Sequence, residues 1–132
     1  MDELVLTLHT YNVYFIWVTF AIAGFWGLIL YFGKRAMIKP WRISLIVAMV
    51  FGMLQAVFGI YMVARGLKPG GGVGDYYLHY MYGGLVALGI PLTWISFTSS
   101  NGENKRYDLL VYSIAAIVIV ALGVRAWMTG PA

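Results

Sequence analysis

Four long stretches of this sequence contain no Asp, Glu, Lys or Arg: residues 4–33, 43–64, 76–102 and 109–124. About 20 apolar residues in a helix cross the roughly 30 Å hydrocarbon core of a bilayer. The pattern therefore predicts four transmembrane helices near residues 8–32, 42–64, 76–98 and 107–128. The strands of a transmembrane β-barrel alternate apolar and polar residues. These unbroken apolar runs show no such alternation, so a barrel is excluded. The predicted fold class is all-α, an integral membrane four-helix bundle in one domain over residues 1–132.

Small and polar residues recur at helical spacing along three of these stretches. They are His9, Asn12, Ile16, Thr19, Ala23 and Gly27 in the first, Ala48, Gly52, Gln55, Gly59 and Met62 in the second, and His79, Gly83, Val86, Ile90 and Thr93 in the third. Small residues let membrane helices approach closely, and buried amides or hydroxyls then bond across the contact. These stripes are therefore predicted to be the faces that meet inside the bundle.

A short pattern occurs twice along the chain. Leu8-His9 is followed 70 residues later by Leu78-His79, and the basic pairs Lys34-Arg35 and Lys105-Arg106 recur at nearly the same offset. The spacing predicts two similar helical hairpins related by a pseudo-two-fold axis along the membrane normal. The first and third helices would then be diagonal, with their histidines facing each other. The alternative is a chance match, because few residues recur.

Composition supports the membrane class and excludes several chemistries. Hydrophobic residues make up 61% of the chain and charged residues 11%, whereas a soluble domain carries about 25% charged residues. There is no cysteine, which excludes disulfides, thiolate metal sites, iron–sulfur clusters and cysteine nucleophiles. No P-loop, HExxH motif or serine–histidine–carboxylate set occurs, and we expect no Asp or Glu inside a span. A familiar hydrolase, a proton pump and a nucleic-acid partner are therefore not expected.

The basic residues are distributed unequally between the two predicted membrane faces. Six lie in the first and third connections and three on the opposite side: Lys34, Arg35, Lys39, Arg42, Lys105 and Arg106 against Arg65, Lys68 and Arg125. The positive-inside rule then places both termini outside. We expect a multi-pass protein of a bacterial or archaeal inner (cytoplasmic) membrane. The acidic start is unlike a signal peptide, so the first span is expected to be an uncleaved anchor.

Both histidines lie at the outer ends of inward-facing stripes, and an ionisable residue inside a membrane is a functional-site candidate. Two neutral imidazoles, His9 and His79, can supply both axial ligands of a haem iron. The diagonal of a square bundle, roughly 14 Å, leaves room for two imidazoles and an iron. Gly83, one turn from His79, would make space for the macrocycle. Arg65 and Arg125 end helices on the same side and could pair with the haem propionates.

Other interpretations of these residues stay open. Histidine is tolerated at the membrane interface and arginine snorkels there; counted from the inner helix ends, His79 lies about one turn deeper than His9. Gln55 either bonds a neighbouring helix or lies at the edge of a quinone or cofactor. Three methionines near the outer face suggest either packing or a copper(I) site: Met62, Met81 and Met128.

Several of these positions together resemble a group of small bacterial four-helix membrane proteins that are similar to cytochrome b561-type haem proteins. The resemblance rests on Leu8-His9, on Leu54-Gln55 followed by Phe58-Gly59, and on Leu78-His79. It covers most of the chain in topology. It implies b-type haem ligated by histidines, here His9 and His79. Cytochrome b561-type proteins commonly hold two haems, whereas two histidines allow at most one bis-histidine haem.

Two classes of function follow from these observations. The first is a small membrane b-type cytochrome with one haem near the outer face, passing electrons to or from quinone or a partner protein. The alternative is a non-catalytic accessory subunit of a larger respiratory or photosynthetic complex. In both cases the chain is an electron-transfer protein or a subunit rather than a stand-alone enzyme, and its surface contacts the lipid bilayer.

Overall fold

The computed structural model describes residues 1–68, 76–97 and 105–129. They form four α-helices: α1 (Asp2–Phe32), α2 (Lys39–Ala64), α3 (Tyr77–Phe97) and α4 (Lys105–Thr129). Each helix is long and apolar enough to cross a bilayer, and large apolar side chains are exposed along all four. Such an apolar exterior requires lipid rather than water around it. The prediction of an integral membrane four-helix bundle is confirmed.

Two helices begin earlier than the sequence pattern predicts. Helix α1 begins at Asp2 rather than near residue 8, with two acidic residues in its first turn, where they interact favourably with the helix dipole. Helix α2 begins at Lys39, with Pro40 in its first turn, a position where the missing N–H costs no hydrogen bond. His9 therefore lies two turns inside α1 instead of opening it. The sequence also predicts a turn at Asn101-Gly102 in the third connection, and these two residues lie outside those that the structure describes.

The ends of α1 and α2 are closed by residues with positive φ. Gly66 (φ 81°) follows α2, and the Leu67 N–H bonds to the Met62 carbonyl at 2.9 Å. Lys34 (φ 56°) plays the same part after α1. Left-handed residues at this position satisfy the last carbonyls of a helix. Both helices therefore stop at the ends expected of transmembrane spans.

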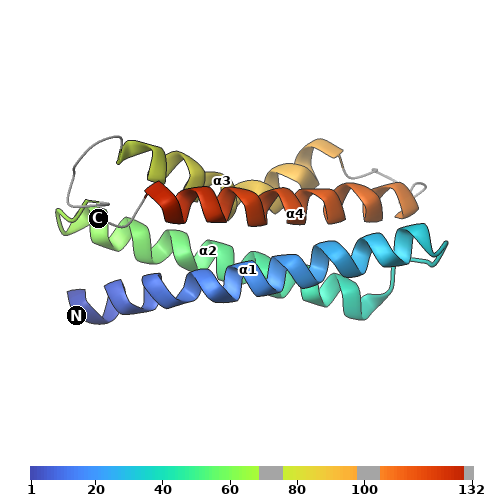
Figure 1. Cartoon of the computed structure of the whole chain (residues 1–132), viewed down its shortest axis with the longest axis horizontal. Helices are drawn as coiled ribbons and strands as arrows, with labels where there is room; N and C mark the ends of the chain where they lie inside the picture. The colour runs from blue at the N-terminus through green and yellow to red at the C-terminus, as the bar shows by residue number, and fades with distance from the viewer. Residues whose placement is uncertain (69–75, 98–104, 130–132) are drawn as a thin grey trace.

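The four helices run antiparallel along one long axis (Figure 1). We call the end where α1 and α3 begin and α2 and α4 end the terminal end. Helix α1 packs closely on α2 and α4, α3 packs closely on α4, and the α2–α3 contact is the weakest of the four. Helices α1 and α3 are therefore diagonal, as predicted. A true two-fold repeat would make the α2–α3 and α1–α4 contacts equal, so any symmetry is approximate.

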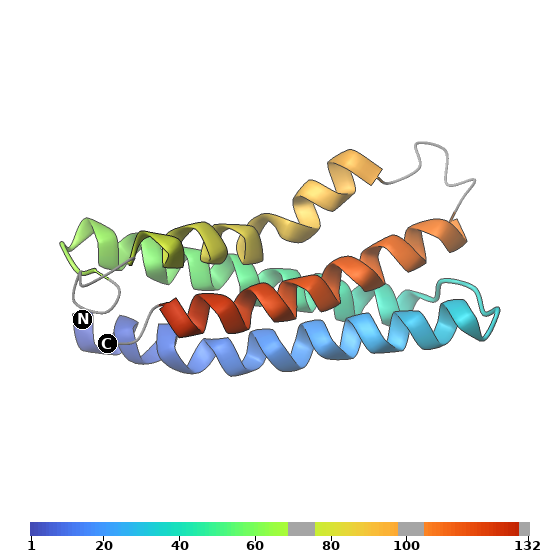
Figure 2. The ribbon, with the colours of Figure 1, turned by 45° about the horizontal axis from the view of Figure 1, so that its top comes forward.

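Helix α3 bends along its length. Figure 2 shows its second half turning away from α4, and Pro91 lies inside this helix. Proline lacks the N–H that would bond one turn back and its ring clashes with the carbonyl there, which kinks a helix. Among the described side chains of α3, the buried ones are Val86, Ala87 and Ile90, which all precede this proline.

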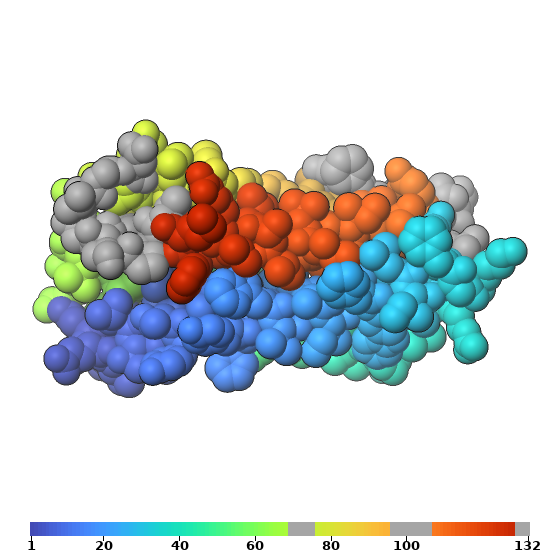
Figure 3. All heavy atoms as spheres, in the orientation of Figure 1, coloured from blue at the N-terminus to red at the C-terminus, as the bar shows by residue number. Residues whose placement is uncertain are grey.

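Helices α1 and α4 pack closely and lie against each other along the face in Figure 3. A methyl group on Gly24 would lie 2.6 Å from Ile117 Cγ1. A methyl group on Gly27 would collide with Ser113 Oγ and lie 2.8 Å from Trp41 Nε1. Absence of a side chain at these two positions is what lets the helices meet.

Trp41 of α2 fills the junction of three helices. It is 1% exposed, and its Nε1–H donates to the Ala23 carbonyl of α1 at 2.8 Å. A buried indole normally finds such a partner, since its unmet N–H would be costly in an apolar interior. The bond ties α2 to α1 at the level where α1 meets α4.

The predicted inward stripes are the buried faces of the helices. The fully buried members are Asn12, Ile16, Ala23, Gly27, Ala48, Gly52, Val86 and Ile90. The remaining members, including His9, Gln55, Gly59, His79 and Gly83, are half-buried. Periodicity thus identified the core of three helices correctly.

Replacing Gly27 by Ala is expected to destabilise the bundle. Neither colliding neighbour can move freely, because Ser113 Oγ donates to the Leu109 carbonyl at 2.6 Å and Trp41 donates to Ala23. Overpacking of this kind costs about 1–3 kcal/mol. Thermal unfolding in detergent should show it, with Gly84→Ala as the control because a methyl group there meets nothing within 4 Å. Equal stability of the two variants would contradict the packing described.

Candidate functional site

The two histidines of the chain meet in the terminal half of the bundle. Their imidazole centroids are 5.9 Å apart, with an interplanar angle of 68°. They come from the diagonal helices α1 and α3, and both are half-buried. The histidines therefore face each other across the bundle, as the stripe periodicity predicts, and a one-turn difference in depth does not keep them apart.

A backbone carbonyl holds the His79 ring. His79 Nδ1 lies 2.7 Å from the Ala126 carbonyl oxygen of α4. Because a carbonyl oxygen only accepts, Nδ1 carries the proton and donates it. In the neutral imidazole, Nε2 then keeps a free lone pair. Histidines that bind metals are typically oriented in this way, with the second ring nitrogen donating to a carbonyl or carboxylate.

The His9 ring has no equivalent support. Its Nδ1 atom is buried and has no hydrogen-bond partner among the residues that the structure describes. A buried polar atom without a partner costs about 1–3 kcal/mol. The nearest atom to a methyl group built on Gly59 of α2 would be His9 Cε1, at 3.7 Å. A glycine therefore faces this ring where any other residue would add a side chain.

The separation of the two rings fits a shared metal ion. Two metal–imidazole bonds of about 2 Å each and two ring radii of about 1 Å each place the centroids roughly 6 Å apart. The observed separation is 5.9 Å, and the rings are edge-on rather than stacked. Two imidazoles are the axial donor set of a six-coordinate haem iron.

Gly83 lies one turn from His79 on the same side of α3. A methyl group on Gly83 would meet nothing within 4 Å, although the residue is half-buried. A side chain at Gly83 would therefore enter open space one helical turn from His79. Gly84 is equally open but points about 100° further round the helix.

An amide pair joins α1 and α2 next to His9. Gln55 Nε2 donates to the His9 carbonyl at 2.8 Å, and Gln55 Oε1 accepts from Asn12 Nδ2 at 2.9 Å. Asn12 Nδ2 also donates to the Phe51 carbonyl at 3.0 Å. We call Gln55 and Asn12 the amide clasp. Of the two interpretations of Gln55, bonding to a neighbouring helix is the one the contacts support.

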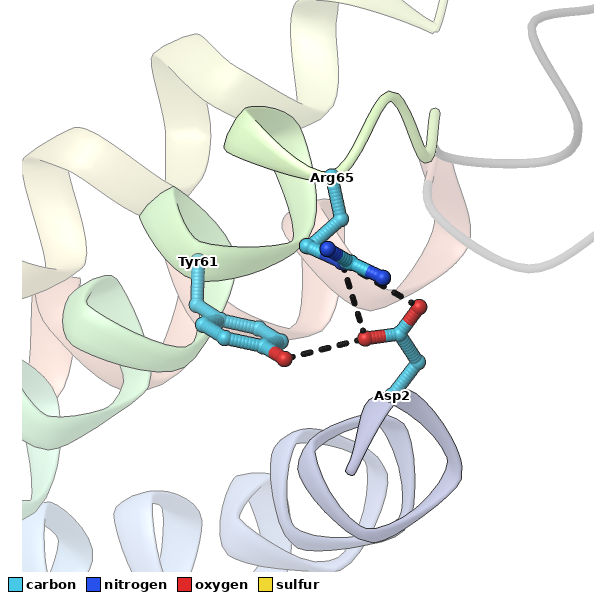
Figure 4. Close-up of polar contacts among 3 residues, drawn as sticks. All are labelled: Asp2, Tyr61 and Arg65. Carbon is cyan, nitrogen blue, oxygen red and sulfur yellow. Dashed lines mark hydrogen bonds and ion pairs between the residues drawn. The ribbon is translucent and has the colours of Figure 1, made fainter.

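Arg65 is engaged by an acidic residue at the terminal end. Its Nε lies 3.2 Å from Asp2 Oδ1, and Tyr61 Oη donates to the same oxygen at 2.9 Å (Figure 4). A shallow hollow of about 480 Å³ lies at this cluster, between Met1, Glu3 and the three side chains. The contact fastens the start of α1 to the end of α2. A propionate at Arg65 would have to share the guanidinium with Asp2.

Arg125 and the methionines lie closer to the surface. The Arg125 guanidinium stands 5.9 Å from the centre of the Tyr82 ring, and Arg125 is exposed. Met81 and Met128 are exposed as well, whereas Met62 is half-buried. Within residues 1–68, 76–97 and 105–129, no group of three or more His, Asp or Glu side chains comes together.

One carboxylate lies where the sequence was expected to place none. Asp108 is in the first turn of α4, inside an apolar span, and is 5% exposed. The expectation of no acidic residue inside a span is therefore wrong. The predicted span of residues 107–128 already contained Asp108, but nothing in the sequence pattern indicated that its side chain would be buried. An acidic side chain is favourable at a helix N-terminus.

Comparisons of this chain with protein-family models, with curated proteins and with solved structures find no match. The function of this chain is therefore inferred from its own residues.

The contact between the histidines can be observed directly. The chain has only two histidines. Protein in which the histidines carry ¹H and all other residues are deuterated therefore gives few imidazole signals. We expect a through-space cross-peak between the His9 and His79 ring protons, and its loss in His9→Asn. Wild-type protein without that cross-peak would contradict the pairing of α1 and α3 described above.

Proposed function

We propose that this chain is a small membrane b-type cytochrome in which His9 and His79 are the two axial ligands of a single haem. The observation that carries the proposal is the pair of imidazoles on diagonal helices at 5.9 Å, a separation compatible with one shared metal ion. When bound, haem supplies a reversible one-electron iron couple. Two neutral imidazoles and an apolar bundle favour a low-spin iron with no open position.

The residues around the pair have distinct roles in this proposal. His79 presents Nε2, because Ala126 holds the proton of Nδ1. His9 supplies the opposite nitrogen, and Gly83 leaves room for the edge of the macrocycle. Arg125 is exposed at the rim and could approach one propionate, and Arg65 could approach the second if Asp2 releases it.

The proposal also concerns where the protein works. We place both termini outside a bacterial or archaeal inner membrane, so that the histidines lie in the outer half of the bilayer. Electrons would pass to or from a quinone or a partner protein at that side. Two histidines hold one haem, so the chain alone would not carry electrons across the whole membrane.

Replacing either histidine by alanine is expected to abolish haem binding or to leave a five-coordinate, high-spin iron. The reduced-minus-oxidised spectrum of protein expressed with ample haem measures this. Thr93→Val is the control, because it removes one helix-internal bond to the Gly89 carbonyl in α3 without touching the pair. Arg65→Gln and Arg125→Gln should reduce haem retention less, since exposed charges contribute little. Normal spectra in both alanine variants would overturn the proposal.

A pair of neighbouring glycines gives a steric test. Gly83→Leu is expected to fill the room beside His79 and exclude haem while the helical content stays normal. Gly84→Leu adds the same side chain to an equally open position on another side of α3, and should leave haem content unchanged. Equal haem content in the two variants would show that the room at Gly83 is not the macrocycle site.

The orientation has its own test. Fusions of an exported reporter and a cytoplasmic reporter to the C-terminus should show activity only for the exported one. Cytoplasmic reporter activity would reverse the orientation and place the histidines on the inner side.

An accessory subunit is the second candidate function. Large apolar side chains on the outer surface favour it, including Ile95 at 73% and Trp94 at 64% exposed, since such a surface can pack on other membrane helices as well as on lipid. Wild-type protein without haem or iron that migrates with a larger complex in mild detergent would support this candidate.

A further inference from the structure

The two histidines are held in place in different ways. The His79 ring is tied to α4 through Nδ1 and the Ala126 carbonyl at 2.7 Å. The His9 ring has no such tie, because its Nδ1 lacks a partner in the part of the chain that the structure describes. The placement of His9 must therefore come from its backbone and its packing.

The amide clasp acts on that backbone. Gln55 Nε2 bonds the carbonyl of His9 itself at 2.8 Å. Its own orientation is fixed, because Oε1 accepts from Asn12, one turn further along α1, at 2.9 Å. Asn12 is 6% exposed and uses its second N–H on the Phe51 carbonyl of α2. The clasp thus joins α2 to the turn of α1 that carries His9.

We infer that Gln55, oriented by Asn12, is a positioning residue that sets the depth and rotation of His9 opposite His79. The inference rests on the proposed function for its effect on haem. A helix held at one turn by two cross-helix bonds cannot rotate there without breaking them, so the imidazole keeps its direction. Residues that orient metal ligands without binding the metal typically change affinity or activity 10–100-fold when replaced.

The test removes the side-chain amide of Gln55 without changing the length of the side chain. Gln55→Met keeps an unbranched side chain of similar size and removes both the donor and the acceptor. Thr93→Val is the matched control, since it also removes one polar group from a half-buried position. We expect haem to transfer from Gln55→Met to a haem-free globin about tenfold faster than from wild type. The ferric electron paramagnetic resonance spectrum should broaden or gain a high-spin signal, and the control should match wild type.

A second readout needs no haem. In the haem-free protein with ¹⁵N-labelled histidine, Gln55→Met should broaden or double the His9 ring signals and leave those of His79 unchanged. The inference would be overturned if Gln55→Met lost haem at the same rate as wild type, gave the same ferric spectrum and showed a single sharp set of His9 signals. If the wild type binds no haem, the proposed function fails, and the His9 signals alone then decide whether the clasp positions the ring.

Discussion

The close contact of α1 with α4 is the constraint on which the rest of the bundle depends. Gly24 and Gly27 bring α1 so near that a methyl group at either position would overlap α4. Helix α4 also holds α3, because Gly89 of α3 packs on Ile119 and His79 bonds to the Ala126 carbonyl. Because packed interiors have few voids, a shift of one helix also displaces the helices that pack on it. Helix α4 therefore sets the distance between α1 and α3, the two helices that carry the histidines.

In the terminal half of the bundle, the two histidine-bearing helices are held at a fixed separation, and glycines near the histidines leave space unoccupied by side chains. One imidazole is oriented through its ring by α4, and the other is placed through its backbone by α2. Beside them, Gly59 and Gly83 present no side chains. A site that binds a flat cofactor needs both features, because its ligands must be preorganised and the macrocycle must find space. The bend at Pro91 affects the other half of α3, so it leaves this arrangement intact.

Charge-free apolar runs were enough to predict the four spans, helical spacing predicted their buried stripes, and the repeated Leu-His pair predicted the diagonal placement of the histidines. Those features depend on side-chain type at regular spacing, which the sequence displays. The hydrogen bond that orients the His79 ring could not be predicted from the sequence. Its acceptor is a backbone carbonyl, which any residue at that position would provide. The bond between Asp2 and Arg65 was also missed, since α1 begins before its apolar run. Opposite charges at the same predicted membrane face were the one available signal for it.

The most direct test of the central claim is the iron content and the ferric electron paramagnetic resonance spectrum of wild-type protein purified with haem supplied. If His9 and His79 share one iron, the protein should contain one haem per chain and give a low-spin signal typical of two imidazole ligands. Addition of cyanide or imidazole should leave that signal unchanged at first, because no coordination position is open. Protein without haem, or with a high-spin iron that binds added ligands at once, would contradict the account.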